Sequence, residues 1–279
     1  MLLRRYDSTE AFKSDVSGVL IENEVQNNLT LSLTAGSQAR RAADWFLATI
    51  SSGKRILLTA LYIEPFALQL YETGNVSSGG AVELLAEEMR RGGLSPSGVV
   101  AEPGLARRFA DAMAGRGAGR LHQSIYAMRM DEPAACKLSP GHPRALEKSD
   151  LRYVPYWERA FSEACRSHVF PIPEYAGRLR ERLGKSAHFI WVDGVPVSQA
   201  VHGRDTPNGA VITEVYTPPR FRGLGYASSV VSALTRALLE SGKRFCCLFA
   251  DADNPVSCGM YRKLGFYEVC GLQEIRFDI

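Results

Sequence analysis

Residues 215–234, with the sequence VYTPPRFRGLGYASSVVSAL, constrain the fold more than any other segment of the chain. Pro218 and Pro219 end a β-rich run, Gly223 and Gly225 follow, and a helical pattern begins directly after them. Glycines let a backbone curl around an anion, and the N-terminus of the following helix adds about half a positive charge. The segment predicts a strand, an anion-binding loop and a helix, although a lone Gly-x-Gly is also typical of a plain tight turn.

The spacing of the glycines narrows the choice of anion. A nucleoside-triphosphate loop requires G-x-x-x-x-G-K-[ST], and a dinucleotide loop requires G-x-G-x-x-G. Ser228 stands where the dinucleotide pattern needs its third glycine, and no Lys-Ser or Lys-Thr pair follows. The sequence therefore argues against a nucleoside triphosphate and a dinucleotide, and the backbone amides of residues 223–227 match a pyrophosphate group better.

The chain downstream of Gly184 predicts the element order β-β-β-α-β-α-β-β, in a mixed and mostly antiparallel sheet. Asn254 is expected to cap the second helix, and Gly271 to separate the two strands of a closing hairpin. In chain order, the segments are HFIWVDGVPVSQAVHG, AVITEVYT, GYASSVVSALTRALLESGK, FCCLFAD, NPVSCGMYRKLGF, FYEVC and LQEIRFD.

The N-terminal part predicts a second, smaller α/β layer. Its clearest segments are the strands KRILLTALYI and LHQSIYAMRM and the helices GAVELLAEEMRR and GLARRFADAMAG. A stretch rich in Pro and Gly then suggests a linker. We therefore expect a domain over 1–138, a linker over 139–149 and a second domain over 150–279.

Two ordered motifs flank the buried strand FCCLFAD: Arg220-x-x-Gly223-x-Gly225 before it, and NPVSCGMYRKLGF after it. Together they resemble the GCN5-related N-acetyltransferase (GNAT) superfamily over about residues 187–279. The resemblance implies a sheet with a splayed central strand pair flanked by helices. It also implies that the N-terminal part is a degenerate second copy, as in tandem members, because no Arg-x-x-Gly-x-Gly occurs before residue 140.

The same resemblance implies acetyl-CoA as the co-substrate. Its pyrophosphate would bind the amides of residues 222–227, its pantetheine arm would follow the strand from Thr213 to Tyr216, and Asn254 would reach the arm. Arg220 and Arg222 either pair with the phosphates or are solvated, and phosphate contact is favoured for at least one of them. The residues implied at the cofactor are Val215, Tyr216, Thr217, Arg220, Arg222, Gly223, Leu224, Gly225, Tyr226, Ala227, Asn254 and Tyr261.

Two side chains are candidates for proton transfer. Tyr261 stands where the superfamily usually places its general acid, and a phenol has a pKa near that of a free thiol; the alternative is a packing role. Glu214 lies mid-strand, where a carboxylate suggests a polar cleft and a general base acting through water. An exposed strand position or an ion pair is the alternative for Glu214. By resemblance alone, the backbone N–H of Tyr216 would polarise the thioester carbonyl.

The leading hypothesis is therefore an N-acetyltransferase that moves the acetyl group directly to a primary amine in a ternary complex, on a small molecule or a peptide. The alternative is a CoA-binding regulatory or scaffold module without turnover. A net charge of +3 argues against a nucleic-acid binder. The five histidines lack metal-ligand spacing, so no metal is expected.

Cellular context follows from the cysteines and from the hydrophobic patterning. Cys246 and Cys247 are adjacent in a buried strand, which predicts free thiols and a reducing cytoplasm. No segment approaches the roughly 18 apolar residues of a membrane span, so no membrane association is expected. The acceptor and the oligomeric state, including a homodimer, stay open.

Overall fold

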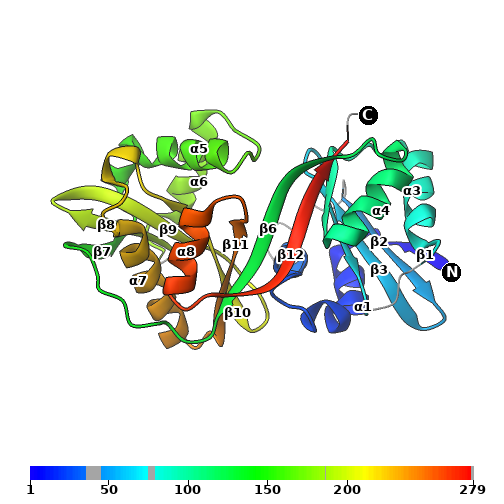
Figure 1. Cartoon of the computed structure of the whole chain (residues 1–279), viewed down its shortest axis with the longest axis horizontal. Helices are drawn as coiled ribbons and strands as arrows, with labels where there is room; N and C mark the ends of the chain where they lie inside the picture. The colour runs from blue at the N-terminus through cyan, green and yellow to red at the C-terminus, as the bar shows by residue number, and fades with distance from the viewer. Residues whose placement is uncertain (36–44, 75–78, 186, 278–279) are drawn as a thin grey trace. The chain divides into compact units, whose positions relative to one another are not determined.

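The computed structural model describes residues 1–35, 45–74, 79–185 and 187–277. The described chain forms two compact units, neither of which is a continuous stretch of sequence (Figure 1). The first unit consists of Met1–Ala127, Ala250–Asp253 and Glu268–Ile279, and the second of Met128–Phe249 and Asn254–Tyr267.

Both halves of the sequence follow the same order of elements, β-α-α-β-β-β-α-β-α-β. The first repeat contains β1 (Leu2–Arg5), α1 (Thr9–Ile21), α2 (Asn28–Ala35), β2 (Phe46–Ser52), β3 (Arg55–Tyr62), β4 (Leu68–Glu72), α3 (Ala81–Arg91), β5 (Gly98–Ala101), α4 (Pro103–Ala114) and β6 (Arg120–Met130). The second contains β7 (His142–Ala145), α5 (Val154–Ala164), α6 (Ile172–Arg182), β8 (His188–Asp193), β9 (Val195–Asp205), β10 (Gly209–Tyr216), α7 (Tyr226–Glu240), β11 (Phe245–Asp251), α8 (Pro255–Lys263) and β12 (Tyr267–Arg276). The predicted tandem arrangement is confirmed.

The sheet of the second unit has the order β11-β10-β9-β8-β7. Strands β7 to β10 are antiparallel neighbours, and the sequence predicted the three of them from β8 to β10. Strand β10 runs parallel to β11 but pairs with it only over residues 209–211. The remaining parts of these two strands are unpaired with each other, which confirms the expected splayed pair.

Helix α7 packs against this sheet through apolar side chains spaced four residues apart. Tyr226, Val230, Leu234 and Leu238 are all buried. Each such side chain contributes roughly 1.5–3 kcal/mol when it leaves water. This packing fixes the helix N-terminus next to the end of β10, because only residues 217–225 join the two elements.

The sheet of the first unit has the order β1-β2-β3-β4-β5-β12-β6 and carries helices on both faces. Side chains alternate along β2: Ala48 and Ile50 belong to a core that includes α3 and α4, whereas Leu47 belongs to one that includes α1 and α2. Because successive side chains of a strand point to opposite faces of the sheet, β2 is buried on both faces.

The C-terminal strand corrects one prediction. Residues 267–276 form a single strand rather than a closing hairpin. Gly271 does not adopt a positive φ, so no turn forms there. The strand instead pairs antiparallel with β5, from Gln273 opposite Ala101 to Arg276 opposite Gly98.

Candidate functional site

The loop before α7 has the geometry of an anion cradle. Gly223 and Gly225 adopt φ angles of +78° and +81°, a region that only glycine enters readily. Residues 222–225 are exposed, and Gly225 begins the helix without any side-chain cap. The first-turn N–H groups, which have no partner inside the helix, therefore face a solvent-accessible loop.

Two exposed arginines flank this cradle. The guanidinium of Arg220 lies 4.5 Å from the ring centroid of Phe221. Arg222 donates from Nε to the carbonyl oxygen of Thr217 at 3.0 Å and lies 5.8 Å from the ring centroid of Tyr216. These contacts leave donor groups on both guanidiniums, so both side chains could bind phosphate oxygens.

Ser139, which lies in the segment predicted to be a linker, forms hydrogen bonds with the loop and with the first turn of α7. Its hydroxyl donates to the carbonyl oxygen of Leu224 at 2.8 Å, and its N–H donates to Ser229 Oγ at 2.8 Å. A Cβ atom on Gly225 would lie 2.7 Å from Ser139 Oγ. Gly225 is therefore required both by its φ angle and by this close approach.

Strand β10 bulges at its open end. Its register against β9 shifts between Thr213 and Tyr216, and Glu214 within the bulge has φ +51°. Tyr216 then pairs with Gln199, and Ser198 Oγ donates to the Tyr216 carbonyl oxygen at 3.2 Å while bonding Thr217 Oγ1 at 2.8 Å. Val215 and Tyr216 thus lie at the strand end that precedes the cradle.

Glu214 belongs to an ion-pair cluster, which was one of the alternatives that its position in the strand left open. Arg182 on α6 donates from Nη1 and Nη2 to the two carboxylate oxygens of Glu214, at 2.6 and 3.1 Å. The same Nη1 donates to Glu158 Oε1 on α5 at 2.7 Å. The side chain of Glu158 is 3% exposed, compared with 22% for Glu214.

The two carboxyl groups of this cluster titrate in opposite directions. Burial, followed by the negative charge of Glu214, raises the pKa of Glu158 to about 9. Burial acts in the same direction on Glu214, but the Arg182 guanidinium outweighs it and lowers the Glu214 pKa. At neutral pH the pair therefore holds one proton, which resides on Glu158.

Helix α8 carries the other two predicted residues. Asn254 caps the helix as expected, because its side-chain oxygen accepts from the N–H of Ser257 at 3.1 Å. Tyr261 is buried, and its ring meets Phe266 edge-on with centroids 5.7 Å apart. Burial raises the pKa of the Tyr261 phenol, so this side chain stays protonated at neutral pH.

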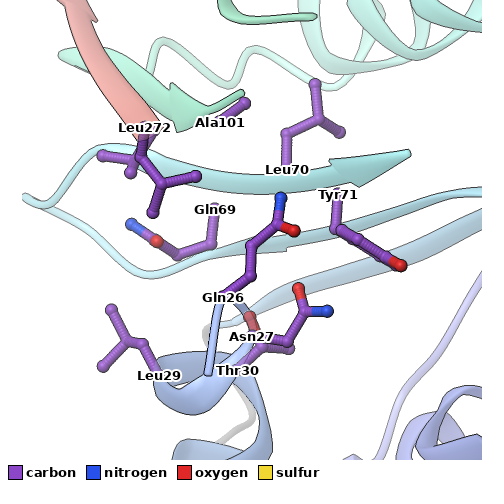
Figure 2. Close-up of a pocket in the computed structure, with 10 residues that line it drawn as sticks. Gln26, Asn27, Leu29, Thr30, Gln69, Leu70, Tyr71, Ala101 and Leu272 are labelled. Carbon is purple, nitrogen blue, oxygen red and sulfur yellow. The ribbon is translucent and has the colours of Figure 1, made fainter. Parts of the chain in front are cut away.

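A small pocket lies elsewhere, in the first unit. Figure 2 shows its uncharged lining, which includes three carboxamides and two hydroxyls among apolar neighbours: Gln26, Asn27, Thr30, Gln69 and Tyr71. Asn23 Nδ2 donates to the Tyr71 hydroxyl at 2.8 Å. This lining contains neither a phosphate-binding cation nor an acid-base pair, whereas all of the site residues predicted from the sequence lie in the second unit.

Three further observations bear on the site. Within the described residues, no group of three or more His, Cys, Asp and Glu side chains is arranged to hold a metal ion. No described helix has both the length and the apolar character of a bilayer span. Cys246 and Cys247 are buried thiols, as predicted.

Sequence reasoning missed Arg182, Glu158 and Ser139. Arg182 lies 32 residues before Glu214 in the sequence, and Glu158 lies in a tyrosine-rich segment that otherwise suggests a core helix. The one available signal was Glu214 itself, since a carboxylate inside a strand requires a partner when it is partly buried.

Comparisons with known proteins agree with this architecture. The family model described as FR47-like protein matches residues 192–276. A GNAT-family acetyltransferase from Colwellia psychrerythraea aligns over 100% of both chains, with 11% identity and a TM-score of 0.61. A GCN5-related N-acetyltransferase from Sphaerobacter thermophilus is 16% identical and has a TM-score of 0.65, over 99% of this chain and 94% of that chain.

A tandem GNAT protein from the clavulanic acid biosynthesis pathway is also similar. It is 15% identical and has a TM-score of 0.55, over 98% of this chain and 97% of that chain. Curated protein sequences give no match. The chain therefore has the GNAT acetyltransferase fold.

Proposed function

We propose that this protein is an acetyl-CoA-dependent N-acetyltransferase that acts on a primary amine. The observation that carries the proposal is the uncapped helix N-terminus behind Gly223 and Gly225, which follows the open end of the splayed strand β10. The exposed backbone amides of residues 222–227, with Arg220 and Arg222 beside them, suit a donor that carries a pyrophosphate. The match to GNAT folds, over nearly the whole chain, supports the same class of chemistry.

Donor binding is assigned to the second unit. The amides of residues 222–227 would bind the pyrophosphate, and Arg220 and Arg222 would pair with phosphate oxygens. Residues 215–217 would hydrogen-bond the pantetheine arm along the strand end. Asn254 would contribute its side-chain nitrogen, since its oxygen is already used in the helix cap.

The transfer step needs a base, a polarising donor and an acid. Glu214 would accept a proton from the acceptor ammonium through a water molecule, and the amine lone pair would then form the new C–N bond. The N–H of Tyr216 would polarise the thioester carbonyl. As the C–S bond breaks, Tyr261 would donate its phenolic proton to the departing thiolate, and the second proton of the acetylated nitrogen would return to the Tyr261 phenolate through solvent.

One observation favours a second candidate function. Arg182 occupies both oxygens of Glu214 and lowers its pKa, which weakens this carboxylate as a base. A module that binds CoA without turnover would tolerate such an arrangement. It predicts donor binding without release of free thiol in the presence of any amine.

Calorimetry and a thiol-release assay separate these outcomes. Wild-type protein is expected to bind acetyl-CoA, and Gly225→Asp to weaken binding by about tenfold or more, because a carboxylate would face the pyrophosphate. Gly117→Asp is the matched control, since Gly117 has φ +79° but an open surrounding in the first unit. Absence of binding by the wild type, or equal binding by Gly225→Asp, would contradict the donor site.

The acceptor is sought by measuring thiol release with acetyl-, propionyl- and succinyl-CoA across a panel of amino acids, polyamines, aminoglycosides and peptides. Release with at least one amine supports the transferase. Donor binding without any release across the panel supports the module without turnover.

A further inference from the structure

The bulge in β10 places a non-glycine residue in an unusual conformation. Glu214 has φ +51°, a region that residues with a Cβ enter only at a cost in free energy. Such a conformation persists when the surrounding structure over-determines it. The contacts around Glu214 should therefore explain why the strand does not relax.

Three hydrogen bonds hold Glu214: two reach its carboxylate and one reaches its backbone carbonyl oxygen. The guanidinium of Arg182 bonds both carboxylate oxygens, a bidentate geometry that fixes orientation as well as distance. Gln199 Nε2 donates to the Glu214 carbonyl oxygen at 3.2 Å. Arg182 is itself held by Glu158, whose carboxyl is almost fully buried.

An aromatic contact and several buried polar atoms that lack partners in the described part of the chain surround the bulge. Trp157 on α5 packs against Tyr216 with ring centroids 6.2 Å apart. Among the described residues, Gln199 Oε1 and both ring nitrogens of His188 lack a hydrogen-bond partner, although both side chains are fully buried. Buried polar groups without partners are rare in native structures.

We propose that Arg182 and Glu158 are positioning residues for acyl transfer, because together they clamp Glu214 and so keep β10 bulged. The clamp aims the N–H groups of Val215 and Tyr216 and keeps the Glu214 carboxylate ionised in one orientation. This inference rests on the proposed function. Helices α5 and α6 then contribute to the transfer step through Glu158 and Arg182, although donor binding is assigned to other elements.

The clamp predicts a loss of turnover without a loss of donor affinity. Arg182→Gln is expected to lower kcat by about 100-fold with the best amine of the panel, because misplacement by about 1 Å costs that much. Its affinity for acetyl-CoA should stay within about twofold of the wild type. Arg182→Lys should recover part of kcat, and Arg180→Gln, an exposed position on the same helix, should behave as the wild type.

Glu158 provides a test by conservative rescue. Glu158→Gln keeps an oxygen that can accept from Arg182, and it mimics the protonated carboxyl, so kcat should stay near the wild-type value. Glu158→Ala removes the acceptor and should lower kcat. If both variants equal the wild type, or both fail equally, Glu158 does not act through Arg182.

The pH profile separates positioning from simple loss of structure. Arg182 lowers the pKa of Glu214, so its removal should move the acid limb of kcat/KM to higher pH. The facing groups are Glu158, Arg182, Arg178 and neutral His188. An unchanged acid limb in Arg182→Gln would overturn the clamp.

Two further experiments test the proposal if Arg182→Gln is unstable or if no acceptor amine is found. The double variant Arg182→Met with Glu214→Gln removes the two ionised partners together, so it should fold even if Arg182→Gln does not, and residues 213–217 of its acetyl-CoA complex should exchange hydrogen faster than those of Arg180→Gln. Without an acceptor, hydrogen exchange of residues 213–217 in the acetyl-CoA complex should be faster in Arg182→Gln than in Arg180→Gln. Equal exchange contradicts the clamp, whereas failure to bind acetyl-CoA contradicts the proposed function itself.

Discussion

Glu158 shows how one buried side chain can couple stability to pH. Burial raises its pKa from 4.5 to about 9, and the adjacent negative charge of Glu214 acts in the same direction. Between these two values the folded state holds a proton that the unfolded state has released. Stability is therefore complete below the lower value and falls as the pH rises toward the upper one.

Glu158→Gln should flatten this dependence. With the titrating group removed, the free energy of unfolding should no longer decline by up to about 1.4 kcal/mol per pH unit across this window. Urea unfolding at a series of pH values measures the effect. Glu163→Gln, at an exposed position on the same helix, should keep the wild-type slope, and an equally steep slope in Glu158→Gln would show that Glu158 is not protonated in the folded protein.

Tyr261 is the residue whose proposed role depends on a single oxygen atom. Tyr261→Phe keeps the ring contact with Phe266 but removes the phenolic proton, so kcat should fall by about 100-fold or more while donor affinity is retained. Steady-state kinetics and calorimetry measure the two quantities. Tyr156→Phe, which alters a tyrosine that is 58% exposed, is the control. A Tyr261→Phe variant with wild-type kcat would rule out the acid role.

At the scale of elements, the loop before α7 and the strand β12 differ in how they are specified. The loop is specified locally, because Gly223 and Gly225 can adopt positive φ angles that other residues avoid. Strand β12 is specified by its partner, because FYEVCGLQEIRFD is compatible with a hairpin until β5 is available to pair with it. A tertiary contact overrides the local turn signal of Gly271.

Strand β12 is the last element of the second repeat, but it pairs with β5 and should therefore stabilise the first unit. Ile275 is fully buried in the core that includes α3 and α4, so Ile275→Ala should cost about 2–5 kcal/mol of unfolding free energy. Val269→Ala, at a 43% exposed position on the same strand, should cost about 0.5 kcal/mol or less. Urea unfolding compares the two, and faster hydrogen exchange in β5 of Ile275→Ala would locate the loss. Equal costs would show that β12 contributes no core to the first unit.

At the scale of the whole molecule, two copies of one element order differ in the residues that the candidate site requires. The first repeat contains the complete order of elements but lacks the Arg-x-x-Gly-x-Gly loop, and its pocket is lined by uncharged groups. The second repeat contains that loop, the splayed strands and the charged cluster around Glu214. The candidate chemistry thus belongs to one repeat, while the strand that ends this repeat completes the sheet of the first unit.

The sequence by itself determined the elements and motifs whose causes are local. Glycine spacing, helix caps and apolar periodicity act over a few residues, so the cradle, the cap at Asn254 and the meander of β8 to β10 could be read directly. Only the tertiary structure decided the partners of Glu214, the contact of Ser139 with the loop and the placement of β12. These depend on side chains and strands that lie 32 to more than 150 residues apart, and single-chain patterns do not encode which distant groups meet.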